Sequence, residues 1–126
     1  MPFELGPLQV HEVCDGTVSL DGGAMFGVVP RPLWERHFTP DARNRITFAL
    51  RCMLVIDGKR RILVDDGIGT RWDGRHRDLY GISNDDRGID AGLARAGLTR
   101  NDITDVVLTH LHFDHAGGTV RDDSGT

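Results

Sequence analysis

The segment between residues 45 and 64 constrains the fold of this chain most strongly. Residues 46–56 form a run rich in β-branched and apolar residues, Asp57-Gly58-Lys59 supplies turn residues, and residues 61–64 return as a second apolar run. This pattern predicts a β-hairpin. Since a two-stranded hairpin is marginally stable alone in water, other segments must cover its apolar faces.

The remaining N-terminal part divides by pattern into strands and loops. Residues 3–13 and 17–20 predict a first pair of short strands joined by a turn at Asp15-Gly16. Residues 21–40 hold three prolines among bulky apolar residues and predict a long, partly apolar loop. The polar run 71–87 predicts a surface loop.

The C-terminal part predicts a helix followed by a strand. Asp86 can cap a helix that runs through Ala96, with apolar residues three and four apart on one face and a glycine at its end. Residues 99–102 resemble a capping box and predict one short turn. Residues 104–109 predict a short strand that leads into His110. The elements together predict a strand-rich α/β chain.

Length and composition exclude several classes of protein. A chain of 126 residues is the size of one domain, and its net charge of −4 gives no basic surface for nucleic acid. No apolar run is long enough to span a membrane and no signal peptide is visible, so we expect a cytoplasmic protein. Cys14 and Cys52 lie far apart without a CxxC pair, which excludes a disulfide framework and favours a buried, inert thiol at Cys52.

The chemistry is concentrated in residues 110–115, HLHFDH. Residues two apart in an extended chain project to the same side, so His110 and His112 can reach one cation. Asp114 and His115 are adjacent and diverge as the chain turns, which lets them face a second cation. Imidazoles with a carboxylate suit zinc, manganese, iron or cobalt better than calcium or magnesium. We therefore expect two divalent transition-metal ions, with zinc as the first choice.

Such a site favours hydrolysis. Two cations lower the pKa of a bridging water to near 7, so that hydroxide can attack a carbonyl or phosphoryl centre. Asp114 is placed to orient this hydroxide and to carry its proton. The alternatives are a closed structural zinc loop and histidines that bind no metal.

Residues 109–118, THLHFDHAGG, resemble the signature of the metallo-β-lactamase superfamily of binuclear metal hydrolases. The resemblance implies a four-layer αββα sandwich, of which this chain corresponds to the N-terminal half. Asp65-Asp66-Gly67 is similar to the family's Asp-Thr-Gly turn, with Asp66 where threonine is usual. That similarity implies that Asp65 steadies the metal-binding histidines, while the alternative is an ordinary turn aspartate.

Residues 21–34, DGGAMFGVVPRPLW, resemble the subgroup that contains quorum-quenching lactonases and organophosphate hydrolases. The resemblance implies a small-molecule substrate with a lactone or ester bond, and a homodimer. It makes Met25, Phe26 and Trp34 candidates for the substrate wall, with burial in the core as the alternative for each.

The family supplies further metal ligands downstream of its motif, whereas no histidine follows His115 here. We therefore expect residues 1–126 to be the N-terminal half of one domain. Its C-terminal half would be on a separate chain, after a cut near residues 122–126, or missing from this sequence, and activity would require it.

Other members of the family keep the motif but differ in chemistry. The alternatives within the family are a thioester hydrolase of the glyoxalase II type, a β-lactamase, a phosphodiesterase acting on RNA and a mononuclear iron dioxygenase. The acidic balance disfavours the RNA enzyme. Outside enzymes, the alternative is a binding module that keeps the motif as a metal staple.

Overall fold

Five strands form one mixed sheet in a computed structural model that describes residues 2–85 and 87–121. The strand order follows the sequence: β1 (Phe3–Leu5), β2 (Leu8–Asp21), β3 (Arg45–Asp57), β4 (Arg60–Val64) and β5 (Asp105–Val107). Neighbouring strands are antiparallel except for β5, which is parallel to β4. The predicted hairpin is confirmed as β3 and β4, and the chain is strand-rich α/β as expected.

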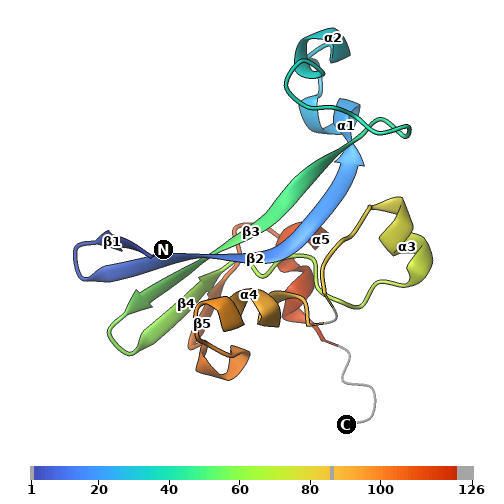
Figure 1. Cartoon of the computed structure of the whole chain (residues 1–126). Coiled ribbons are helices and arrows are strands. Elements are labelled where there is room, and N and C mark those ends of the chain that lie inside the picture. The colour runs from blue at the N-terminus through green and yellow to red at the C-terminus, as the bar shows by residue number, and fades with distance from the viewer. Residues whose placement is uncertain (1, 86, 122–126) are drawn as a thin grey trace.

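Short helices lie between and beside the strands of this sheet. They are α1 (Gly22–Phe26), α2 (Arg31–Trp34), α3 (Gly74–Leu79), α4 (Ile89–Arg95) and α5 (Phe113–Ala116), with 3₁₀ turns η1 (Arg100–Asp102) and η2 (Gly117–Thr119). Strands β2 and β3 form a long curved ribbon that carries α1 and α2 at its tip, while α4 and α5 lie along its base (Figure 1). None of the helices within the described residues is long and apolar enough to cross a membrane.

The turn predicted at Asp15-Gly16 is wrong, because β2 continues through it as a β-bulge. The register between β2 and β3 shifts between Cys14 and Thr17, and Gly16 has a φ of 113° that favours glycine. The first turn lies instead between β1 and β2, where Leu5 pairs with Leu8. The bulge accommodates Asp15 and Gly16 within the strand, so β2 does not end at this turn-like dipeptide.

The two predicted loops contain helices that the sequence pattern did not indicate. In residues 21–40, α1 begins where the Asp21 side chain accepts a hydrogen bond from the amide of Ala24 at 2.8 Å. In residues 71–87, α3 begins where Asp73 accepts from the amide of His76 at 2.8 Å. Both helices are too short to show an apolar period, so their caps were the usable signal.

The C-terminal predictions hold with shifted boundaries. Helix α4 begins at Ile89 after Gly88, and the predicted cap at Asp86 lies outside the described residues. The capping box is confirmed at Thr99 and Asp102, and the predicted final strand is the shorter β5.

Most of the buried residues form two clusters on the face of the sheet that α4 and α5 cover. One cluster joins β2, β3 and β4 to α4, and its buried members are Val13, Cys52, Leu54, Leu63, Ile89 and Leu93. The other joins the distal halves of β2 and β3 to the segment after β4, and its buried members are Val18, Leu50, Ile68 and Ile82. Cys52 is thus buried and free, as expected.

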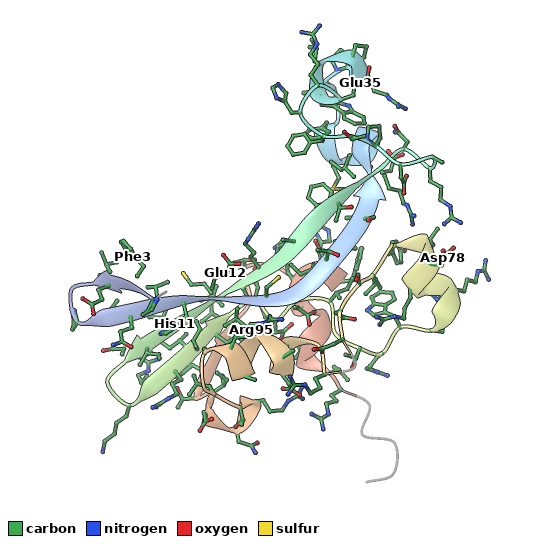
Figure 2. The ribbon with its side chains drawn as sticks, viewed as in Figure 1. Phe3, His11, Glu12, Glu35, Asp78 and Arg95 are labelled. Atoms are coloured by element: carbon green, nitrogen blue, oxygen red, sulfur yellow. The ribbon has the colours of Figure 1, made fainter. Side chains whose placement is uncertain are left out.

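The opposite face of the sheet carries a row of partly or fully exposed apolar residues beside the charged Glu12, Arg51 and Asp105. Phe3 and Glu12 point away from α4, whereas His11 lies on the same side as Arg95 of α4 (Figure 2). The strand register places a row of apolar residues on the face with Phe3, which is 65% exposed. The row comprises Phe3, Leu5, Leu8, Val10, Met53, Val55, Ile62, Val64 and Val107. We call this row the open sheet face.

Candidate metal-binding site

The predicted motif begins where two parallel strands end. Asp65 follows β4 directly, and Thr109 and His110 follow β5 after one further residue. Because β4 and β5 are parallel, their carboxyl ends meet at one edge of the sheet, as is common for ligand sites in α/β folds. The chain then turns into α5, which carries Asp114 and His115.

Asp65 occupies the centre of this edge. Its φ of 59° is unusual for a residue with a side chain, and such strained positions cluster at functional sites. One carboxylate oxygen accepts hydrogen bonds from the amide of Thr109 at 2.8 Å and from its hydroxyl at 3.0 Å. The other lies 2.9 Å from the Thr109 hydroxyl and 2.9 Å from Nδ1 of His115. Burial opposes ionisation of Asp65, but hydrogen bonds from His115 and Thr109 outweigh it and lower its pKa.

This network sets the tautomers of two histidines. An ionised carboxylate only accepts, so Nδ1 of His115 carries the hydrogen that binds Asp65. The Thr109 hydroxyl has one hydrogen, which it donates to Asp65, so it accepts from Nδ1 of His110 at 3.0 Å. Both assignments, made from the hydrogen-bond network, leave Nε2 of His110 and of His115 as free lone pairs suited to a metal ion.

The four predicted ligands lie close together. The ring of His110 lies 4.0 Å from that of His115 and 4.8 Å from that of His112, measured between centroids. Nε2 of His115 lies 3.5 Å from a carboxylate oxygen of Asp114. The described residues nevertheless include no cluster of three or more donor side chains with the spacing of a metal site. Three imidazoles and a carboxylate suit a transition-metal ion. The described side chains lie near one another but do not form a complete coordination sphere.

Asp66 fastens the chain that follows the motif. Its carboxylate, which is almost fully buried, accepts from the amide of Gly118 at 3.0 Å and from the hydroxyl of Thr119 at 2.6 Å. Its own amide donates to the carbonyl of His115 at 2.9 Å. Burial raises the pKa of Asp66 despite these hydrogen bonds. With aspartate in place of the family's usual threonine, two acceptor oxygens bind η2, the turn that follows α5.

Two of the cavities between described residues are lined by residues 113–115 of the motif. One, of about 180 Å³, is lined by Asp65, Asp114 and His115 together with side chains of β2 and β3. The other, of about 420 Å³, has a mostly apolar wall that includes Phe113. Both are lined by Leu20 and Met25, so Met25 stands between the motif and the apolar space.

The other two candidates for the substrate wall belong to an aromatic cluster at the ribbon's tip. The ring of Phe26 stacks on that of Trp34 at 5.1 Å and lies 5.3 Å from that of Phe38. Trp34 is 4% exposed and covers Gly22, where an added Cβ would lie 2.5 Å from the indole ring. In the described residues, Trp34 lies in neither cavity wall and packs within the tip.

Sequence reasoning missed three residues at this edge. Thr109 links Asp65 to His110, and its place immediately before the first histidine was the available signal. Asp66 and Asp15 act through partners 52 to 54 positions away, which no local pattern reveals.

The sequence pattern of the metallo-β-lactamase superfamily matches residues 48–120. The solved structure of a probable metal-dependent hydrolase from Staphylococcus aureus is 36% identical, with a TM-score of 0.82 over 92% of this chain and 42% of that one. The structure of AidC, a dizinc quorum-quenching lactonase with a bound product, is 26% identical, with a TM-score of 0.70 over all of this chain and 40% of that one.

Among curated proteins, the metallo-hydrolase mfmC of Annulohypoxylon moriforme is 24% identical over 112 residues, which are 81% of this chain. The chain spans 12% to 29% of the length of the curated relatives it matches. Its five-stranded sheet corresponds to the N-terminal part of the family's fold. Since the family's pattern covers more than half of the chain, including the whole of residues 110–115, this chain belongs to the metallo-β-lactamase superfamily.

Proposed function

We propose that this chain is the N-terminal half of a metal-dependent hydrolase that acts on lactone or ester bonds. The observation that carries the proposal is the Asp65 network, which leaves Nε2 of His110 and of His115 free, with that of His115 3.5 Å from Asp114. His110 and His112 would hold one divalent ion, and Asp114 and His115 the other, with zinc as the expected metal. When bound, the ions supply a nucleophilic hydroxide near neutral pH and polarise the substrate carbonyl.

The protein's own groups would do the remaining work. Asp65 holds the rings of His110 and His115 in one tautomer and orientation, which keeps the ligand atoms in place without rearrangement. Asp114 carries a carboxylate at the cavity and would accept the nucleophile's proton, then return it to the leaving oxygen. This assignment gives Asp114 two roles, as a ligand and as a proton carrier.

The apolar cavity supports a substrate with an apolar group. Met25, Phe113 and Leu20 line the space next to Asp114 and His115, so an acyl chain there would direct its carbonyl toward the motif. Relatives such as AidC, whose structure holds an N-acyl homoserine product, make a lactone the first substrate to test.

The same proposal requires a covering segment for the open sheet face. Contiguous apolar surface of this kind marks an interface, and here Phe3, Met53 and Val107 are each at least 43% exposed. The chain spans about two fifths of the solved relatives. We assign the covering role to the C-terminal half of the same domain, which would also bring the missing metal ligands.

The homodimer, the cytoplasmic location and the absence of nucleic-acid and membrane partners stay predictions. The tip of the ribbon supports the dimer, since Val28 is 99% exposed there beside exposed Leu33 and Phe38.

The full-length protein, loaded with zinc, tests this function on a panel of substrates. The panel comprises a lactone with an apolar acyl chain, an aryl ester, a thioester, a β-lactam, a phosphodiester and a phosphotriester. We expect the highest kcat/KM on the lactone or ester, its loss with a chelator, and its return with zinc. Hydrolysis of the thioester, β-lactam or phosphodiester alone would contradict the proposed substrate, and hydrolysis of none would contradict the enzyme.

A further inference from the structure

Asp15 is a buried carboxylate outside the motif that contacts the loop after β4. It lies in the bulge of β2 and is 2% exposed. One oxygen, Oδ2, accepts from the amide of Ile68 at 2.8 Å and from that of Gly69 at 3.2 Å. The other, Oδ1, is buried and accepts no hydrogen bond of good geometry from the described residues, although the nearby Asn84 amide favours the ionised carboxylate.

Such a group is costly for folding. Burying a carboxylate with an unpaired oxygen opposes stability, and an asparagine would present an acceptor to the same two amides without a charge. The contribution of Asp15 therefore lies less in net stability than in the position of the loop whose two amides it binds. The role follows from what the loop contacts on its other side.

The loop of residues 66–69 is held between Asp15 and the end of the motif. An added Cβ on Gly67 would lie 2.3 Å from the Asp15 carboxylate, and the φ of 77° at Gly67 also favours glycine. On the far side, the carbonyl of Gly67 accepts from the amide of Gly117 at 2.9 Å. An added Cβ on Gly117 would lie 2.2 Å from the carbonyl oxygen of Ile68. A shift of the loop therefore moves the motif.

We infer that Asp15 is a positioning residue for the metal-binding motif and acts through loop 66–69. The chain of contacts runs from Asp15 to the amides of Ile68 and Gly69, and from Gly67 to Gly117, two residues after His115. This role rests on the proposed metal site. Asp15 lies in β2, more than ninety positions before the motif, so a residue of the first long strand helps to hold the metal ligands in position.

The test compares Asp15→Ala, Asp15→Asn and Val13→Ala in the full-length protein. Val13 is fully buried on the same strand and contacts α4 rather than the loop, so Val13→Ala is the matched control for lost packing. The readouts are zinc affinity by chelator competition and the visible spectrum of the cobalt-loaded protein. We expect Asp15→Ala to weaken zinc binding about 10-fold and to change the cobalt spectrum. We expect Asp15→Asn and Val13→Ala to match the wild type in both.

Gly67→Ala gives an independent test if Asp15→Ala does not fold. It keeps the carboxylate but displaces the loop from it, and we expect the same spectral change as for Asp15→Ala. If Asp15→Ala, or Gly67→Ala where Asp15→Ala does not fold, has the wild-type cobalt spectrum and the wild-type zinc affinity, the inference is wrong. The proposed metal site would not be contradicted by that result. Failure of the wild type itself to bind metal would overturn the proposed function and this inference together.

Discussion

Nδ1 of His115 lies 2.9 Å from a carboxylate oxygen of Asp65, and the same carboxylate reaches His110 through the hydroxyl of Thr109. One aspartate directly after β4 therefore fixes the tautomers of two histidines, His110 shortly after β5 and His115 in α5. Asp65 and His115 are 50 positions apart in sequence, and the parallel pairing of β4 with β5 brings them together.

Asp65→Asn should weaken metal binding by about 10- to 100-fold. The amide would donate to Nδ1 of His115 and force its hydrogen onto Nε2, which then cannot bind a metal. Asp73→Asn is the matched control, because Asp73 lies 2.8 Å from Nδ1 of His76 on exposed helix α3. Chelator competition measures both variants, and equal zinc affinities would contradict the role of Asp65.

Asp114→Asn should reduce kcat by about 10²- to 10⁴-fold on the best substrate, because the amide can carry no proton. Its shape is nearly unchanged, so thermal unfolding of the metal-free protein should stay at the wild-type temperature. A zinc-loaded wild type without activity, whose zinc-dependent gain in thermal stability is lost in Asp114→Asn, would instead indicate a structural metal staple.

Stability should depend on pH through Asp15. Burial raises its pKa, although hydrogen bonds from Ile68 and Gly69 oppose the shift. The folded protein then binds a proton more tightly than the unfolded chain, so this contribution is full below the unfolded value of about 3.9 and is lost as pH rises through the folded pKa.

Asp15→Asn removes that titration. We expect the variant to unfold at higher urea concentration than the wild type at pH 7, with the difference shrinking toward pH 4. Urea unfolding of the full-length proteins at both pH values measures this difference. A difference that stays constant with pH would contradict a raised pKa at Asp15.

Met25 and Trp34 should respond in opposite ways to truncation. Trp34→Ala leaves a cavity under Phe26 and should lower the free energy of unfolding by about 3 kcal/mol, whereas exposed Leu33→Ala should change it by less than about 0.5 kcal/mol. Met25→Ala should raise KM for a long-chain lactone with little loss of stability, because Met25 lines the cavities beside the motif. An unchanged KM would remove Met25 from the substrate wall.

Local patterns predicted those parts of the molecule whose causes are local. The hairpin of β3 and β4 followed from its two apolar runs and the Asp-Gly-Lys turn between them, and the capping box from Thr99 and Asp102. The motif was predicted because its six residues are neighbours in sequence, and its place after a strand because residues 104–109 form an apolar run directly before His110. The bulge at Asp15-Gly16 read as a turn, since only pairing with β3 keeps the strand continuous there. The roles of Asp15 and Asp66 depend on amides and a hydroxyl more than fifty positions away, which the sequence cannot place.

Metal content measured by native mass spectrometry of the full-length protein tests the central claim most directly. After incubation with zinc, we predict two ions per polypeptide for the wild type, and fewer for His110→Ala and His115→Ala. The exposed His37→Ala is the control and should keep both ions. A wild type that binds no zinc, or a stoichiometry that the two motif variants leave unchanged, would contradict the account.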